Sequence, residues 1–244
     1  MNFGKLGLLF WLATVASAAQ PPCAAAQALS SGNIWPEDEV AFELIGQVKN
    51  SPPAGPGLPA TSVQYGYLPY INGLTTEQVF DTGGSKNETT ARFTFYNDSV
   101  TVRVVPHGRW TIVTREGTMT IYHDDTPDGD LTTPNPDSFR DGIAVLTSTW
   151  RHQVIFEAAH SGLFFVTFEN KVTSVEPFFL EGSEIRLAKI GDRYRINLVG
   201  GLDPAGLVNG KFAGTATVLG NRKLQNTAPP ALLLEPLNWR RSEP

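Results

Sequence analysis

The clearest pattern in the chain is an alternation of apolar and polar side chains with a period of two residues. In residues 40–49, Phe42 and three other apolar residues share one face, and the polar residues share the other. Successive side chains of a β-strand point to opposite faces, so this segment is predicted to be a strand with one buried face. Residues 193–198 repeat the pattern, with Tyr194 and Ile196 on the predicted buried face.

Turn-forming residues divide the rest of the chain into further short segments of strand-like composition. These lie at residues 91–96, 100–105, 110–115, 118–123, 143–157, 163–170, 184–190, 193–199 and 211–219. Asn97-Asp98 is predicted to form a turn, and Glu116-Gly117 a two-residue hairpin connection in which glycine supplies the positive φ. Residues 50–60 are rich in proline and glycine and are predicted to form a loop, whereas residues 75–80 are the best helix candidate.

The N-terminus has the features of a secretory signal peptide. Lys5 precedes an apolar stretch over residues 6–15, and the small residues at 16–18 match the pattern that signal peptidase recognises. Residues 1–18 are therefore predicted to be a cleaved signal and residues 19–33 a flexible leader, with a retained membrane anchor as the alternative. The barrel-forming region is predicted to cover residues 34–224, followed by a last strand or tail over residues 225–244. The protein is accordingly expected to be secreted.

The predicted strands are separated by turns roughly every 8 to 15 residues. This spacing is typical of an all-β barrel or sandwich. We predict a single antiparallel β-barrel or a closed sandwich. A signal peptide followed by antiparallel strands of this number and length resembles calycin and allene-oxide-cyclase-type barrels in architecture, without a shared sequence motif. The resemblance implies a barrel that encloses one small molecule.

Composition narrows the choice of partners. The only cysteine, Cys23, forms no internal disulfide, so the core must hold the fold together. A net charge of −5 and the lack of a Lys/Arg cluster argue against nucleic acid and anionic membranes as partners. The sequence has no phosphate-binding loop, dinucleotide fingerprint or Cys/His metal spacing, so no cofactor is expected. The oligomeric state stays open.

Two histidines are candidates for chemistry because imidazole transfers protons near neutral pH. Alternation places His152 on the apolar face of residues 143–157 together with Trp150, and it places His123 on the apolar face of residues 118–123. His152 is predicted to donate a hydrogen bond to a ligand or to act as an acid or base, with Trp150 and His123 as further ligand contacts. A core histidine with one hydrogen bond is the alternative for both.

The acidic segment that follows His123 is a candidate cation site. Asp124, Asp128 and Asp130 partly follow the ligand order of an EF-hand loop, but the twelfth position holds Asn135 where that loop has a glutamate. The alternative is a solvated connection that contains Asx turns.

Four other residues are candidates for ligand or glycan attachment. Tyr65 and Tyr67 are predicted either to form an aromatic platform at a binding mouth or to pack a long loop against the barrel. Asn87 and Asn97 begin glycosylation sequons in segments that are predicted to be turns, and both are expected to carry glycans if the source is a eukaryote.

Several charged residues fall opposite the apolar faces of their predicted strands. They are Arg103, Arg115, Arg151 and Glu157. We expect them on the surface, where cross-strand ion pairs contribute only about 0.2 to 1 kcal/mol.

Three functions fit these observations. The first is a secreted β-barrel that binds a small apolar molecule in its interior. The second is an isomerase or cyclase-type enzyme that uses the same cavity, with His152 as acid or base and without a redox cofactor. The third is a non-catalytic extracellular module with a structural or adhesive role. Since architecture alone does not decide function, a cavity would favour the first two, and a filled interior would favour the third.

Overall fold

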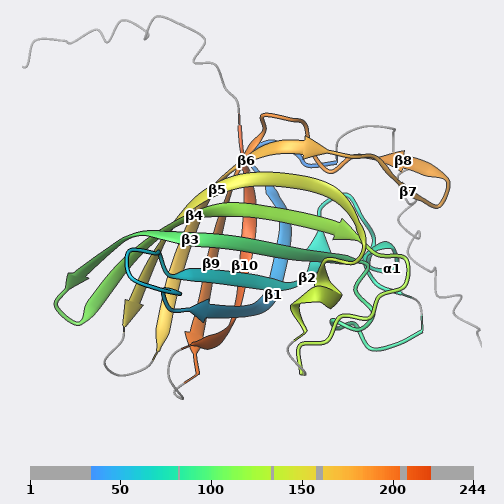
Figure 1. The fold of residues 1–244 in the computed structure, drawn as a ribbon. Helices are drawn as coiled ribbons and strands as arrows, with labels where there is room; N and C mark the ends of the chain where they lie inside the picture. The colour runs from blue at the N-terminus through green and yellow to red at the C-terminus, as the bar shows by residue number, and fades with distance from the viewer. Residues whose placement is uncertain (1–33, 82, 133–134, 158–161, 204–207, 221–244) are drawn as a thin grey trace, which may run out of the picture.

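The main feature of the computed structural model, which describes residues 34–81, 83–132, 135–157, 162–203 and 208–220, is a closed β-barrel (Figure 1). The barrel strands are β1 (Val40–Ser51), β2 (Thr61–Ile71), β3 (Phe93–His107), β4 (Trp110–His123), β5 (Ile143–Glu157), β6 (Leu163–Val175), β9 (Arg193–Leu202) and β10 (Asn209–Leu219). The other elements are helix α1 (Thr76–Val79), the 3-10 helix η1 (Pro136–Phe139), β7 (Phe178–Leu180) and β8 (Ser183–Ile185).

The barrel is an antiparallel meander. Its strand order is β1-β10-β9-β6-β5-β4-β3-β2, and β1 pairs with both β2 and β10, which closes the sheet. The hairpin of β7 and β8 is inserted between β6 and β9 and forms its own two-stranded sheet. The prediction of an all-β fold with a single antiparallel barrel is confirmed.

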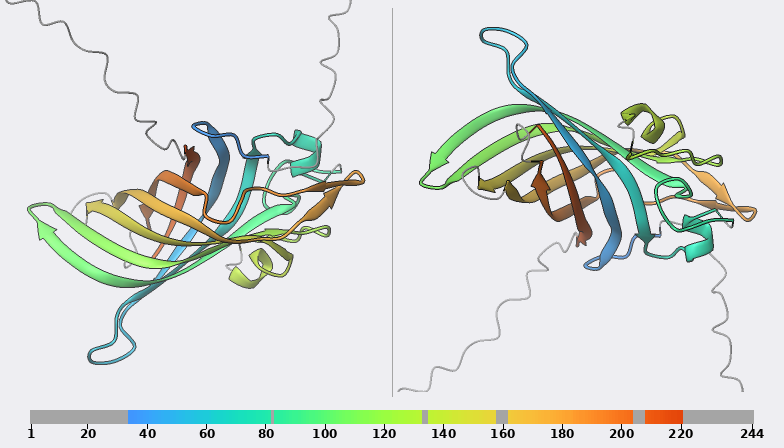
Figure 2. Two further views of the ribbon diagram at one scale, coloured as in Figure 1. Left: turned by 90° about the horizontal axis from the view of Figure 1, so that it is seen from above. Right: turned by 90° about the horizontal axis from the view of Figure 1, so that it is seen from below.

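The connections divide between two ends of the barrel (Figures 1 and 2). The β1–β2 loop and the β3–β4 turn project at one end, on the left in Figure 1, which we call the hairpin end. Helix α1, η1 and the β7–β8 hairpin lie at the opposite end, which we call the helical end. The interior is filled by large side chains toward the helical end and is hollow toward the hairpin end.

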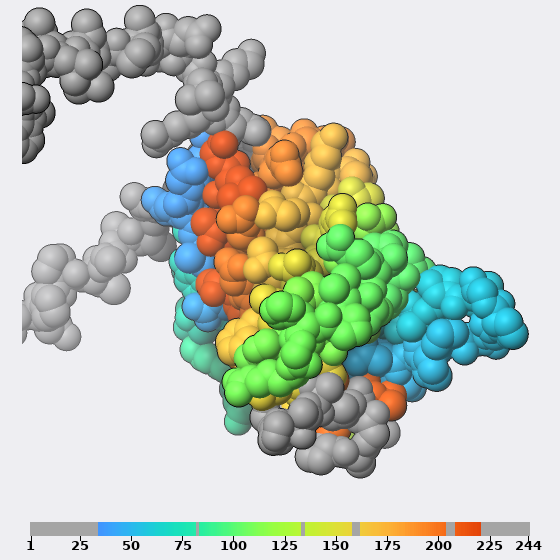
Figure 3. Space-filling model, turned by 90° about the vertical axis from the view of Figure 1, so that its left-hand side faces the viewer, coloured from blue at the N-terminus to red at the C-terminus, as the bar shows by residue number. Residues whose placement is uncertain are grey.

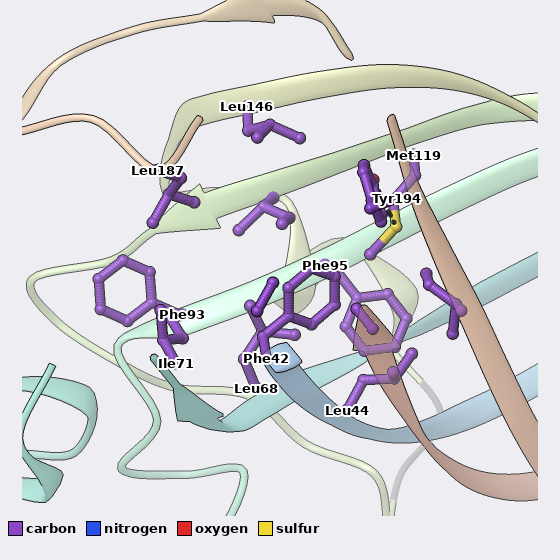
Figure 4. Packing of buried hydrophobic residues seen from close by; sticks show 14 of the residues in the cluster. Phe42, Leu44, Leu68, Ile71, Phe93, Phe95, Met119, Leu146, Leu187 and Tyr194 are labelled. Atoms are coloured by element: carbon purple, nitrogen blue, oxygen red, sulfur yellow. Dashed lines mark hydrogen bonds between the residues drawn. The ribbon is translucent and has the colours of Figure 1, made fainter. Parts of the chain in front are cut away.

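Large side chains fill the interior toward the helical end (Figure 4). Phe42, Tyr194 and Ile196 are fully buried there, as their alternation predicted. The Trp35 ring lies 5.3 Å from the Phe42 ring and 5.2 Å from the Tyr194 ring, between ring centroids. The Tyr194 hydroxyl and the Ser148 hydroxyl lie 2.7 Å apart, so each of these buried polar groups has a partner. This part of the barrel is a packed core.

Strands β3 and β4 are continuous where the sequence predicted a turn and a hairpin. Asn97-Asp98 lies in the middle of β3, and Glu116-Gly117 lies in the middle of β4. The connecting turn lies instead at Gly108-Arg109, where Gly108 has a φ of 61°. Gly117 is needed for a different reason, since a Cβ at this position would collide with the backbone oxygen of Asp98 on the paired strand.

Other predicted segments agree with the structure to different degrees. The predicted strand at 143–157 matches β5, whereas the strand predicted at 184–190 is reduced to β8 and the helix predicted at 75–80 to α1. No strand was predicted for the residues of β2, where a long loop packed against the barrel was one alternative. The predicted signal, the leader with Cys23 and the C-terminal tail over residues 225–244 lie outside the described residues.

Candidate functional site

The interior toward the hairpin end is hollow. A cavity of about 310 Å³ lies there, bounded by side chains from seven of the barrel strands. Its apolar wall residues are Val48, Val113, Val154, Phe156, Phe164, Val166, Leu198, Leu202 and Phe212, and its polar wall residues are Asn50, Gln64, Thr111 and Arg115. Figure 3 views the molecule from this end, with the β3–β4 hairpin in green crossing the face and the β1–β2 loop in cyan projecting at one side.

Arg115 supplies the charge in this wall. The prediction that it lies on the surface was wrong, because the neighbouring apolar residues Ile112 and Val113 occupy both faces of β4 and the inward face is the one shared by Val113 and Arg115. The Arg115 Nε donates to the hydroxyl of Thr101 at 3.2 Å, and Nη2 donates to the Asn50 side-chain oxygen at 2.8 Å. Burial lowers the pKa of Arg115 to about 10, so the side chain stays charged at neutral pH.

Within the part of the chain that the structure describes, no carboxylate forms an ion pair with Arg115. Both of its hydrogen-bond partners are neutral. Two ion pairs between neighbouring barrel strands, Arg195 with Glu169 and Arg151 with Glu116, involve exposed side chains. A charge withdrawn from water without a counter-charge is unfavourable, which makes Arg115 the most unusual group in the cavity wall.

His152 lies directly opposite Arg115 in the β4–β5 register and points into the barrel. It is 1% exposed, its ring stacks on Trp150 with a centroid distance of 4.7 Å, and it meets Phe168 edge-on at 4.7 Å. Neither ring nitrogen has a hydrogen-bond partner among the described residues. Burial and, to a lesser degree, the charge of Arg115 lower the pKa of His152 to about 3. The imidazole is therefore neutral at physiological pH and offers one N–H donor and one acceptor.

The structure does not bring His123 together with His152. His123 is 4% exposed and lies toward the helical end, with its ring 5.0 Å from the Phe93 ring and 5.2 Å from the Phe178 ring. Burial lowers the pKa of His123, and the nearby Asp125 opposes this effect. Its contacts are those of a core residue, and its role as a ligand contact stays a prediction.

Tyr65 and Tyr67 lie on the outer side of the barrel wall. The preceding residue in β2, Gln64, lines the cavity, so alternation turns both tyrosines outward. Tyr65 packs against Phe139 of η1 at 5.4 Å, and Tyr67 packs against Phe80 beside α1 at 6.4 Å, between ring centroids. The two rings attach covering segments to the barrel and are not part of the cavity wall.

The acidic segment brings together a different set of carboxylates from the one predicted. Asp124, Asp128 and Asp141 each place an oxygen within 4.8 Å of the others. Asp130 is not in this group, and its carboxylate accepts hydrogen bonds from the backbone N–H and the hydroxyl of Thr132, each at 2.7 Å. Desolvation, followed by the charges of Asp141 and Asp124, raises the pKa of Asp128. Cation binding by this segment stays a prediction.

The two sequons lie in different environments. Asn87 lies in a turn, where its side-chain oxygen accepts hydrogen bonds from the backbone N–H of Thr89 at 3.1 Å and from the Thr89 hydroxyl at 2.9 Å. Asn97 lies within β3, is 2% exposed, and donates from Nδ2 to the Gln64 side-chain oxygen at 3.2 Å. The turn predicted at Asn97 was wrong because the residue lies within β3 with its side chain buried and its Nδ2 hydrogen-bonded to Gln64, and this buried nitrogen has no room for a glycan.

Sequence reasoning missed the cavity wall, although a signal for it exists. If β4 is treated as one strand, Val113 and Arg115 share their two-residue period with the buried Met119 and Ile121. The predicted hairpin at Glu116-Gly117 separated these residues and allowed the first half of the strand to be assigned the opposite face.

No protein family, curated protein or solved structure matches the chain. Among the described residues, no helix has both the length and the apolar composition needed to span a membrane. The functional argument therefore rests on the cavity and on the groups that line it.

Proposed function

We propose that the protein binds a small, largely apolar molecule in the cavity at the hairpin end of the barrel. The observation that carries this proposal is an interior space of about 310 Å³ with nine apolar side chains in its wall. Ligand pockets typically begin near 300 Å³ and are mostly apolar, with a few polar groups that orient the ligand. With roughly 30 Å³ for each water-sized group, the space suits a ligand of roughly ten non-hydrogen atoms.

The remainder of the barrel supports this use of the cavity. The large side chains around Phe42 and Tyr194 fill the helical end of the barrel, so the space is confined to the hairpin end. An apolar ligand gains about 25 cal/mol for each Å² that it removes from water. A structural or adhesive module would have no need of such a cavity. The signal-like N-terminus supports a role outside the cell, where the ligand would be taken up or carried.

The enzyme alternative uses the same cavity but gains less support. A histidine that acts as acid and base must change protonation near the working pH. With a pKa of about 3, His152 stays neutral, and neither His152 nor Trp150 is among the residues that line the cavity.

A cavity-blocking variant tests the proposal. We would measure binding of octan-1-ol by calorimetry and identify by mass spectrometry any small molecule that copurifies with the protein. Val154→Phe enlarges a side chain of the cavity wall, whereas Val104→Phe makes the same change at a position that is 54% exposed on β3. We expect the wild type and Val104→Phe to bind the alcohol and Val154→Phe to bind at least tenfold more weakly. Absence of binding to the wild type, or equal binding by the two variants, would refute the proposal.

A further inference from the structure

We infer that the ligand of this cavity carries a carboxylate, which Arg115 binds inside the barrel. The inference deepens the proposed function and rests on it. It names the class of ligand as a small apolar carboxylic acid in its anionic form. Two features of the site support it.

The first feature is the hydrogen bonding of the guanidinium group. Arginine has five N–H donors in a planar fork that matches the two oxygens of a carboxylate. The Arg115 Nε and Nη2 donate to Thr101 and Asn50, which fixes the orientation of the group. Its Nη1 makes no hydrogen bond to any described residue. The end of the fork that carries Nη1 is thus available to a ligand in the cavity that Arg115 lines.

The second feature is charge. Among the described residues, the cavity wall contains Arg115 but neither aspartate nor glutamate. An anionic ligand would supply the missing counter-charge in a place where water screens it poorly. A neutral ligand would leave the charge unpaired, and a cationic ligand would be repelled. The site therefore discriminates between ligands of the same shape by their charge.

The test compares two ligands of nearly equal size that differ in charge. Octanoate and octan-1-ol would be titrated by calorimetry at pH 7.5 into the wild type, Arg115→Met and Arg115→Gln. Arg151→Met is the matched control, since its side chain is 60% exposed and faces Glu116. We expect the wild type and the control to bind octanoate at least tenfold more tightly than octan-1-ol. Both Arg115 variants should lose that preference while still binding the alcohol.

The possible failures are distinguishable. If octanoate and octan-1-ol bind equally well to the wild type, or if the Arg115 variants keep the preference, the carboxylate inference is overturned and the cavity function stands. If neither ligand binds the wild type, both proposals are overturned. Arg115→Gln serves as the second variant should Arg115→Met fail to fold, because glutamine keeps a polar end that can reach the oxygen of Asn50.

Discussion

Replacing Arg115 by methionine should leave the empty barrel at least as stable as the wild type, which is unusual for a residue of a barrel interior. Burial lowers the pKa of Arg115 from its ordinary value to about 10. Each pKa unit corresponds to about 1.36 kcal/mol, so the charge destabilises the fold by at most about 3.5 kcal/mol. Partial solvent screening reduces this figure, and the hydrogen bonds to Thr101 and Asn50 return about 1 kcal/mol each. Because methionine fills irregular apolar space well, we expect the variant to gain about 1 kcal/mol or to be neutral.

The assay is urea denaturation of both proteins without ligand, with Arg103→Met as the control for an exposed arginine on the neighbouring strand. The sign of the pH dependence provides a second check. The unfolded chain keeps its proton up to a higher pH than the folded chain does, so the cost of Arg115 is complete below about pH 10 and decreases as the pH rises above that value. A loss of 2 kcal/mol or more in Arg115→Met, relative to the control, would refute the argument that the charge lacks a counter-charge.

A saturating ligand should reverse the order of the two proteins. At a free octanoate concentration of 100 times Kd, the wild type gains about 2.7 kcal/mol from linkage, and a variant that no longer binds octanoate gains much less. Arg115→Met should therefore be at least as stable as the wild type without ligand, and the wild type should be the more stable protein with octanoate bound. An equal gain by both proteins would separate Arg115 from ligand binding.

Three further predictions concern other parts of the barrel. Tyr194→Phe should lower the free energy of unfolding by about 1 to 2 kcal/mol because it leaves the buried Ser148 hydroxyl without its partner. Ser148→Ala should cost about 1 kcal/mol, because the Tyr194 hydroxyl keeps the Met119 sulfur as an acceptor at 3.6 Å. The double variant should cost less than the sum, and additive losses would contradict this. In protein secreted by a eukaryotic host, peptide mass spectrometry should find glycan on Asn87 but not on Asn97, and a glycosylated Asn97 in folded protein would contradict the inward orientation. Asp128→Asn should raise the unfolding midpoint at pH 7, because desolvation and two neighbouring carboxylates raise the pKa of Asp128, and the gain should vanish as the wild-type carboxyl becomes protonated at low pH.

The aspartate prediction has a control and an additional readout. Asp98→Asn removes a carboxylate that is exposed on β3 and lies outside the acidic group, and it should leave the midpoint nearly unchanged. Millimolar calcium should raise the midpoint of the wild type but not of Asp128→Asn if the acidic group binds a cation, since a ligand that binds only the native state stabilises it. A midpoint at pH 7 that falls in Asp128→Asn would show that the carboxylates do not repel one another.

The alternation of apolar and polar side chains was enough to predict the barrel. The alternation arises from one property alone, which is the burial of one face of each strand. Residues 143–157 show this plainly, since Trp150 and His152 share a buried face with Leu146 and Ser148 in the middle of β5. The errors arose where residues typical of turns lie inside long strands. Asn97 is held in β3 by the amide of Gln64, and Gly117 is held in β4 by the close approach of β3. Both reasons are tertiary, and local propensity does not contain them.

The inward orientation of the Arg115 side chain could not be predicted from the sequence, for a related reason. Ile112 and Val113 are adjacent apolar residues, so alternation alone allows either face of this part of β4 to point inward. The outward face is itself apolar here, since Ile112 pairs with Ile155, which in turn pairs with Phe165, and the last two are exposed on the barrel surface. With apolar residues on both faces, only the closure of the sheet decides which face lines the interior. The same closure decides that the charge lies inside.

The cavity exists because several inward-pointing side chains at the hairpin end are small, while the radius of the barrel is nearly constant along its length. Closing eight strands sets the width of the interior, so the residues that point inward decide whether it is filled. Along β5, Trp150 fills its layer while Val154 leaves space, and along β1, Phe42 fills its layer while Val48 leaves space. The two strands are not neighbours, yet their small residues meet at the same end. A space assembled from several strands in this way is a property of the closed sheet, and the charge of Arg115 within it gives that space a chemical preference.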